Sequence, residues 1–230
     1  MELIQTYTEY TKCSIVRETM STTDLRTRKR LAMRQGISNA ATRLFAARGF
    51  DHVTVDEIAA AADVGRMTVF NHFPRKEDMF FDRDEEGRAL LRDALRDRDP
   101  GVSPVETYRR LAHRLVAAGS PVVEFSADSQ AFMATIAASV ALQARARAIR
   151  DEIALVVRTA LAESVGREVD DAGAHLASQL LLSTWSVALV QAHAAYARAG
   201  DAAAASRLFL AIVDKGTLGA AAAMAGTPYA

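Results

Sequence analysis

The sequence predicts an all-α protein in which a small three-helix head at the N-terminus precedes a larger helical domain. The chain of 230 residues contains only 12 glycines and 5 prolines, and half of its residues are apolar. With abundant alanine, this composition has a strong helical bias and allows a substantial core. In successive segments, apolar residues recur at i, i+3, i+4 and i+7, the spacing of helices that are buried on one face. Glycine, proline or aspartate separates these segments, as at helix ends.

The first 23 residues show no helical or strand period, and we expect them to form a flexible tail. Met20 offers an alternative start, so residues 1–19 need not belong to the native protein. Cys13 is the one cysteine, which excludes an intramolecular disulfide and fits a reducing cytoplasm. No uninterrupted apolar run approaches the roughly 18 residues that span a bilayer, and the N-terminus lacks the apolar core of a secretory signal. We therefore expect a cytoplasmic protein without a membrane partner.

A first head helix is predicted from Asp24 to Arg48, where Gly49 favours a left-handed stop. The chain as a whole has no net charge, with 28 basic and 28 acidic residues. This segment is different, because residues 21–50 contain seven Arg or Lys and a single acid, Asp24. The apolar stripe of the helix consists of Ile37, Ala40, Ala41, Leu44 and Phe45.

Residues 54–73 form two short predicted helices joined by a tight turn. Thr54 and Glu57 fit a capping box, in which each side chain satisfies a free backbone N–H of the other residue. The turn is predicted at residues 63–65, and the second helix runs from 66 to 73, before Pro74. An apolar face of the first helix repeats at helical spacing: Val55, Ile58, Ala59 and Ala62.

The second of these helices directs Val69 and Phe73 inward. A helix this short must pack on its neighbour and present its other face to a partner, as a helix-turn-helix does in the major groove of DNA. A run of basic residues is usually a solvent-exposed helix face. Because this basic helix is predicted beside the helix-turn-helix, we expect it to contact DNA phosphates instead. The outward side carries Met67, Thr68, Phe70 and Asn71.

From Thr54 to Met79 the sequence resembles the DNA-binding head of the tetracycline-repressor (TetR) family of bacterial transcription regulators. The family pattern is roughly Gly-Val-Ser-x-Gly-Thr-Leu-Tyr-x-His-Phe, followed after two residues by Lys-Glu-x-Leu. The chain departs from it at Asp63, Gly65, Met67 and Phe70, and Phe70 cannot donate the phosphate hydrogen bond of the family tyrosine. It keeps or conservatively replaces Val64, Thr68, Val69, His72, Phe73, Lys76, Glu77 and Met79.

The resemblance implies an operator-binding head at residues 24–73 and a ligand-binding and dimerisation domain at residues 74–230. A fourth helix is predicted from Arg75 to about Arg98. In the family arrangement its first turn faces DNA, and its far end enters the second domain, so that it would act as a lever. The DNA-contacting residues expected from the resemblance and from the outward face are Arg28, Thr54, Arg66, Met67, Thr68, Phe70, Asn71, His72 and Lys76.

Five further helices are predicted, at residues 104–118, 129–147, 148–165, 170–198 and 201–224. In TetR-like proteins the last two helices pair with their two-fold mates as a four-helix bundle. An internal hairpin packed only within the monomer is the alternative. The first reading implies a homodimer with contacts through Leu208, Phe209, Ile212 and Val213.

Large apolar side chains are spread over several helices of the second domain. Simple core packing accounts for most of them, and the alternative is a pocket that holds a small ligand. Trp185 lies beside three small hydroxyl residues, and such a mixture suits a ligand wall. The candidate ligand-binding residues are Phe125, Phe132, Met133, Ile136, Leu142, Trp185 and Leu189.

No motif predicts catalysis, a metal site or a cofactor. His175 and His193 share a helix face but lie about 27 Å apart at 1.5 Å per residue, too far to hold one metal. The chain lacks a Gly-rich phosphate loop, a Cys-x-x-Cys pair and a Gly-x-Ser-x-Gly elbow. We therefore predict a non-enzymatic one-component regulator, a repressor released from a near-palindromic operator by a small, mostly apolar ligand. The alternative is a helical small-molecule-binding or scaffold protein that has lost operator binding.

Overall fold

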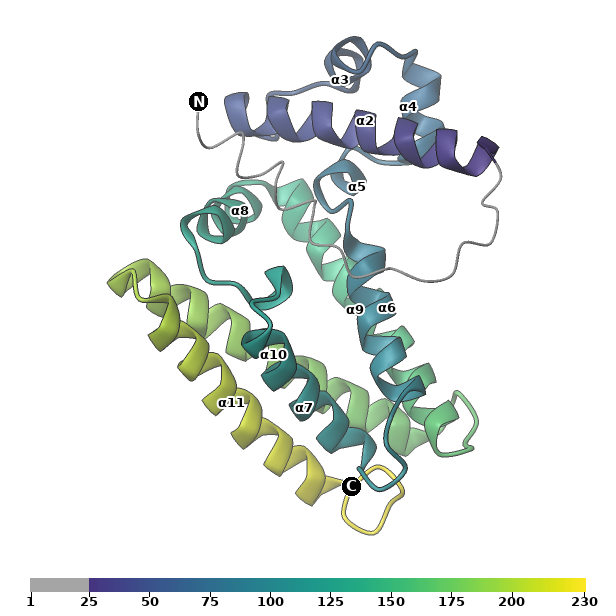
Figure 1. The fold of residues 1–230 in the computed structure, drawn as a ribbon, viewed down its shortest axis with the longest axis vertical. Coiled ribbons are helices and arrows are strands. Elements are labelled where there is room, and N and C mark those ends of the chain that lie inside the picture. Colours follow the sequence, from purple (N-terminus) through teal and green to yellow (C-terminus); the bar gives the residue numbers. More distant parts are fainter. Residues whose placement is uncertain (1–24) are drawn as a thin grey trace. The chain divides into compact units, whose positions relative to one another are not determined.

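The computed structural model describes residues 25–230, so the expected tail, Met20 and Cys13 lie outside the described residues. The prediction of an all-α fold is confirmed, since this part of the chain contains helices and no strand (Figure 1). The helices are α2 (Leu25–Arg48), α3 (Val55–Ala61), α4 (Arg66–His72), α5 (Glu77–Phe80), α6 (Asp84–Arg96), α7 (Pro104–Ala117), the 3₁₀ turn η2 (Pro121–Val123), α8 (Ala127–Ala138), α9 (Val140–Ser164), α10 (Ala172–Ala199) and α11 (Ala202–Ala223).

The chain divides into two compact units between Asp82 and Arg83, nine residues later than the boundary expected after Phe73. The difference arises because α5 packs on α2 and therefore belongs to the first unit. Met79 of α5 is buried, and the Ser38 hydroxyl of α2 donates a hydrogen bond to the Asp82 carboxylate. The first unit, which we call the head, thus contains four described helices, α2 to α5.

The core of the head forms where the apolar stripes of its helices meet. Ile37 and Ala41 of α2, Ile58 of α3 and Val69 of α4 are fully enclosed, as their periodicity predicts. Gly49 ends α2 with a φ of 81°, the left-handed conformation expected of a helix stop. Asp63 takes a φ of 53° in the turn between α3 and α4, so aspartate fills the position where the family pattern has glycine.

The expected single helix from 75 to about 98 is wrong. Two helices replace it, α5 and α6, and the chain between them leaves helical conformation at Phe81–Arg83. Met79 anchors α5 in the head core, whereas α6 begins a new unit with Asp84, Glu85 and Glu86 in its first turn. Carboxylates there are favoured by the positive end of the helix dipole, which makes residue 84 a natural start.

The second unit, residues 83–230, is built on α10 and α11, which lie side by side (Figure 1). A Cβ added to Gly216 of α11 would lie 2.3 Å from Thr184 Cγ2 of α10, so glycine allows the two helices to approach closely. Alanines of both helices, including Ala188 and Ala205, are fully buried in the same core. The helix α7 packs against α11, and α6 packs against α9.

The break between the helices of residues 127–164 lies at Ser139, earlier than the expected join near residue 147. The Ser139 hydroxyl accepts a hydrogen bond from the Leu142 N–H and so caps α9, which then continues unbroken to Ser164. A second cap starts α8, where Ser126 and Ser129 form a reciprocal capping box. Serine caps of this kind can be recognised in a sequence. Here the residues on both sides are rich in alanine, so the helical pattern of the sequence continues through the cap.

In the described part of the chain, α10 is long and apolar enough to cross a membrane by length and composition. No such run was expected from the sequence, because isolated polar residues interrupt this segment. One face of α10 carries Ala174, Ala177, Ala188 and Ala192, all fully buried in the core of the second unit. A core helix of a soluble protein has the same composition, and α10 is therefore weak support for membrane insertion.

Candidate nucleic-acid interface

The outward face of α4 is placed as the sequence predicts. Val69 and Phe73 are fully buried in the head, so the opposite side of this two-turn helix faces away from the core. Met67 exposes 70% of its surface, and Asn71 one turn later is exposed as well. Thr68 and Phe70 flank these two residues and are half-buried. The face therefore offers one large apolar side chain and one amide to a partner.

Arg66, at the start of α4, is held across the turn by an ion pair with Asp56 of α3, with Nη1 3.0 Å from Oδ2. Its guanidinium also lies 5.5 Å from the centre of the Phe70 ring. Both contacts are on the surface and contribute little to stability. Their effect is on the position of the guanidinium, which they direct towards α3.

Thr54 and Glu57 form the capping box predicted at the start of α3. The Thr54 hydroxyl accepts from the Glu57 N–H, and the Glu57 carboxylate accepts from the Thr54 N–H at 2.8 Å. Arg48 of α2 also donates to Glu57 at 2.7 Å. The bond from the Thr54 backbone, and then that from Arg48, lowers the pKa of Glu57 to about 2. Thr54 is thus an exposed cap whose side chain is already engaged.

Arg34 of α2 has a role that the sequence analysis missed, as it counted only as one more basic residue. Its Nη1 donates to the His72 carbonyl at 2.6 Å and so satisfies an orphan acceptor at the end of α4. The guanidinium lies 4.0 Å from the centre of the Phe73 ring. Burial and then the positive charges of Arg30 and Arg34 lower the pKa of His72, which keeps its half-buried ring neutral at pH 7.

Lys76 does not extend freely from the head, which corrects its expected role in phosphate contact. Its Nζ donates to the carbonyls of Phe50 and Val53, each at 3.0 Å, and lies 4.1 Å from the centre of the Phe50 ring. The ammonium therefore fixes the turn that leads from α2 into the Thr54 cap of α3. From the sequence, the lysine of this motif is expected to be a charge on the surface. Only the fold shows the two carbonyl groups that accept its hydrogen bonds.

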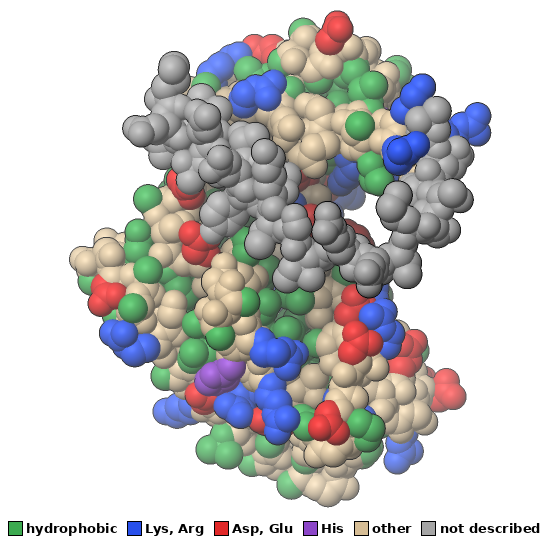
Figure 2. Space-filling view, in the orientation of Figure 1, with side chains coloured by type: hydrophobic (Ala, Val, Ile, Leu, Met, Phe, Trp, Pro, Cys, Tyr) green, Lys and Arg blue, Asp and Glu red, His purple; other side chains and the backbone are tan. Residues whose placement is uncertain are grey.

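A group of exposed cations lies near the N-terminal end of α2, where Arg28, Lys29 and Arg30 follow one another. Figure 2 shows Lys and Arg side chains at that end of the helix, which is purple in Figure 1. Exposed guanidinium and ammonium groups close to a helix-turn-helix are suited to contact phosphate.

The seven candidate ligand-binding residues are in different environments. Phe125 and Leu142 are buried, and Phe125 belongs to the core of the second unit. The other five, from α8 and α10, are half-buried. Trp185 packs edge-on against Phe209 with ring centres 5.8 Å apart, and its buried Nε1 has no hydrogen-bond partner among the described residues. An unpaired buried donor is costly, and a ligand acceptor would relieve that cost.

Polar groups lie close to this aromatic cluster. Gln130 of α8 donates to the His193 carbonyl of α10 at 2.7 Å, and the His193 ring packs against Phe125 with centres 5.0 Å apart. Burial lowers the pKa of His193. No residue of α8 is buried, although the helix is mostly apolar. The region between α8 and α10 thus combines aromatic surface, a few polar groups and one loosely packed helix.

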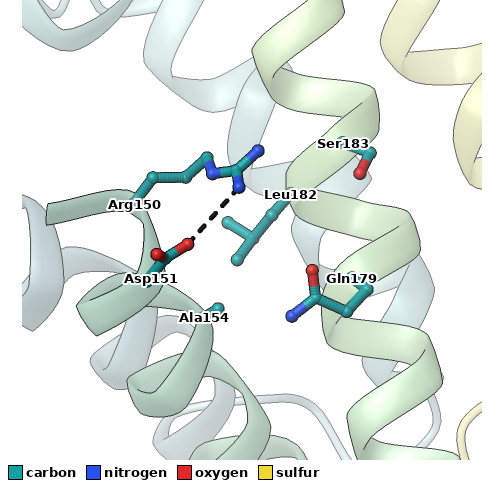
Figure 3. A pocket seen from close by; sticks show the side chains of 6 residues that line it. All are labelled: Arg150, Asp151, Ala154, Gln179, Leu182 and Ser183. Carbon is teal, nitrogen blue, oxygen red and sulfur yellow. Dashed lines mark hydrogen bonds and ion pairs between the residues drawn. The ribbon is translucent and has the colours of Figure 1, made fainter. Parts of the chain in front are cut away.

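Two hollows in the second unit lie elsewhere. Figure 3 shows the smaller, about 10 Å³, which α9 and α10 line with Arg150, Asp151, Ala154, Gln179, Leu182 and Ser183. It holds no more than one water molecule. The larger, about 280 Å³, is lined by Ser103, Val105, Glu106, Arg109, Asp214, Thr217, Leu218 and Ala221. Neither contains a predicted ligand-binding residue, and charged groups border the larger one.

Two of the four expected dimer contacts are unavailable to a partner. Phe209 and Val213 are fully buried in the core of their own protomer, whereas Leu208 and Ile212 are half-buried. The sequence shows the apolar stripe of α11 but not which neighbour covers it. The exposed large apolar residues of the α10–α11 pair are instead Leu176, Val187, Val190 and Leu218.

Together, the head and the helical unit define the class of protein: an all-α chain with an N-terminal helix-turn-helix. Residues 37–82 match the family model described as bacterial regulatory proteins, tetR family. This match covers α3, α4 and α5, the elements that build the turn and its supports. Over these residues the chain is similar to the TetR family.

Curated relatives match over the N-terminal part. The chain is 40% identical over 63 residues to the transcriptional regulator TcmR of Streptomyces glaucescens, covering 27% of this chain and 28% of that protein. It is 31% identical over 94 residues to the uncharacterized regulator YhgD of Bacillus subtilis, covering 41% and 46%. The matches thus span less than half the length of these two relatives.

Solved structures resemble the chain over most of its length. FadR of Thermus thermophilus, a TetR-family transcriptional repressor in complex with lauroyl-CoA, has a TM-score of 0.52 and 26% identity, covering 81% of this chain and 92% of that one. A TetR-family regulator from Mesorhizobium loti has a TM-score of 0.53 at 17% identity, covering 83% and 97%, and supports the fold alone.

Proposed function

We propose that the protein is a one-component transcriptional regulator that binds a near-palindromic operator as a homodimer. The observation that carries the proposal is the outward face of α4. Met67 and Asn71 are exposed there, while Arg34 and Asp56 hold the two ends of the helix on the head. A fixed helix that presents an apolar and an amide side chain is suited to read base edges, with phosphate contacts from the start of α2.

Repression is the proposed mode of action, and FadR of Thermus thermophilus, a repressor, supports it at 26% identity. The protein has no proposed catalytic role, because the two carboxylates that line the larger hollow, Glu106 and Asp214, are both paired with Arg109. A cytoplasmic location follows from a role on chromosomal DNA.

The proposed effector is a small, mostly apolar molecule that binds between α8 and α10. The aromatic cluster of Phe125, Trp185 and Phe209 supplies apolar surface, and Trp185 Nε1 supplies a hydrogen-bond donor without a partner. The lauroyl-CoA in the FadR complex supports an acyl chain as the first ligand to test. The 280 Å³ hollow, with its charged border, suits an apolar ligand less well.

The proposed dimer interface is the face of α10 and α11 that is turned away from the core. Both helices bury one side in the same core and lie side by side, so their opposite sides form one two-helix surface. Val187 and Val190 are exposed on it, and Leu208 and Ile212 of α11 are half-buried. A lasting dimer through this surface should bury more than about 2,000 Å² in total.

The test is retention of genomic DNA. Purified protein is incubated with fragmented DNA of its own genome, and the bound fragments are sequenced. We expect enrichment of a few fragments that share a near-palindrome with half-sites about one helical turn apart. Uniform retention of all fragments, or none, would contradict the proposal and favour the alternative of a helical ligand-binding or scaffold protein.

Ligand and operator should weaken each other's binding. Inside the second unit, α6 is tied to α9 by Arg88, which contacts Asp84 and Glu152, and by Arg145, which contacts the same two carboxylates. A ligand that shifts α9 therefore shifts α6. Residues 81–83 connect α6 to α5, which belongs to the head. A tenfold preference per site is about 1.4 kcal/mol, so two sites lower operator affinity about 100-fold.

Trp185 provides the readout for this linkage, since it is the one tryptophan of the chain. Its fluorescence is titrated with lauroyl-CoA, in the presence and absence of the isolated operator. We expect the operator to weaken ligand binding by the same total factor as the ligand weakens operator binding. Equal ligand affinity in the two titrations would exclude the switch while leaving DNA binding intact.

A further inference from the structure

Met67 is the most exposed apolar residue on the outward face of α4. It exposes 70% of its surface on the outward side of α4, although a thioether side chain gains nothing from water. Asn71 follows at i+4, one turn further along the same face, and is exposed too. The two side chains therefore lie about 6 Å apart along the helix axis at 1.5 Å per residue.

The cation of α4 is turned away from this pair. Arg66 is bound to Asp56 and lies over the Phe70 ring, so its guanidinium is engaged on the α3 side. Arginine is the commonest reader of guanine, through O6 and N7. Between Met67 and Asn71 the outward face carries no cation, and Thr68 and Phe70 are the other outward residues. The face therefore lacks the side chain that a guanine-reading site uses.

The apolar side chain of Met67 and the amide of Asn71 match groups that bases present in the major groove. Thymine is the base that presents a methyl group there, and apolar side chains contact it. Asparagine accepts from N6 and donates to N7 of adenine in a two-bond pair. A separation of about 6 Å along the helix corresponds to at most about two base steps of 3.4 Å.

We propose that Met67 and Asn71 read a thymine methyl group and an adenine, one or two steps apart, in each operator half-site. The inference rests on the proposed function, because it names the bases that the α4 face recognises. Met67 is the specificity-determining contact that separates this chain from relatives with a small residue at that position of the family pattern.

The test uses the operator isolated from genomic DNA, with single atoms changed. Each thymine is replaced in turn by deoxyuridine, which removes the methyl group and leaves base pairing intact. Each adenine is replaced by 7-deazaadenine, which removes the N7 acceptor. We expect one thymine per half-site at which deoxyuridine lowers the affinity at least about fivefold, the lower limit for a base contact. An adenine within two steps should respond to the 7-deaza change.

Variants assign the contacts to side chains. In Met67→Ala the critical deoxyuridine should cause no further loss, and in Asn71→Ala the 7-deaza change should cause none, because each contact is already gone. Met67→Gln keeps the length of the side chain and should also become insensitive to the methyl group. Met33→Ala is the matched control, since Met33 is an exposed methionine of α2 outside the reading face. It should retain the full deoxyuridine effect.

The outcomes separate the two proposals. Retention of no specific fragment would refute the proposed function itself. Specific binding that no deoxyuridine weakens, or a deoxyuridine effect that persists unchanged in Met67→Ala and Met67→Gln, would overturn the methionine–thymine contact. An unchanged 7-deaza effect in Asn71→Ala would overturn the amide–adenine contact. Circular dichroism of each variant verifies that the head is folded, as expected for changes at exposed positions.

Discussion

Replacing Val187 with arginine is expected to convert the proposed dimer into a monomer that is still folded. Val187 exposes 53% of its surface in the protomer and lies on the side of α10 that is turned away from the core. Arginine at this position is solvated in the monomer. In the dimer it would be buried twice across the two-fold axis, each time as an unpaired charge that costs several kcal/mol. We expect the dissociation constant to rise at least about a thousandfold.

Light scattering at micromolar concentration measures the change in mass, and thermal unfolding followed by circular dichroism measures the fold. Val122→Arg is the matched control, because Val122 is similarly exposed but belongs to η2 and not to α10 or α11. The control should remain dimeric. A dimeric Val187→Arg protein, or a monomeric parent, would contradict the proposed interface.

Val213→Arg is the informative contrast on α11. This side chain is fully buried within the protomer, so the variant should lose folded structure altogether instead of dissociating cleanly. The two arginine variants therefore separate the inward side of the α10–α11 pair from its outward side.

Replacing Lys76 with methionine should destabilise the head and weaken binding to all DNA sequences alike. The variant keeps the aliphatic stem but loses the two hydrogen bonds to the Phe50 and Val53 carbonyls. A hydrogen bond from a charged donor contributes about 1.5–3 kcal/mol, and because Lys76 is partly exposed we expect the two bonds together to contribute about 2 kcal/mol. A loss of about 2 kcal/mol lowers the Tm of a unit of this size by roughly 10 °C.

The salt dependence distinguishes this structural role from phosphate contact. Lys29→Met is the matched variant, since Lys29 is an exposed lysine near the start of α2. It should leave the Tm unchanged and flatten the salt dependence of binding by about one phosphate contact. Lys76→Met should do the reverse: a lower Tm and an unchanged salt slope at a temperature where the head is folded. A flatter slope with an unchanged Tm in Lys76→Met would show that the lysine binds phosphate after all.

The features of the head that the sequence alone determined are the local ones. The Thr54–Glu57 capping box, the left-handed Gly49 and the inward side of α4 all depend on residues within one or two helical turns. Backbone hydrogen bonding and helical periodicity act over the same short range, so spacing was sufficient to predict them. The outward position of Met67 and Asn71 follows from the same period.

The tertiary structure decided everything that needed a distant partner. Lys76 and Arg34 look like two more surface cations, and only the fold brings them to carbonyls that are 23 to 38 residues away in sequence. The break at Phe81–Arg83 arises because Met79 is held in the head core while α6 packs on α9. The apolar stripe of α11 can be predicted from the sequence. Its periodicity shows that one side of the helix is buried, but not which element covers that side. Val213 therefore belongs to the protomer core, because burial depends on contacts between elements that local spacing does not encode.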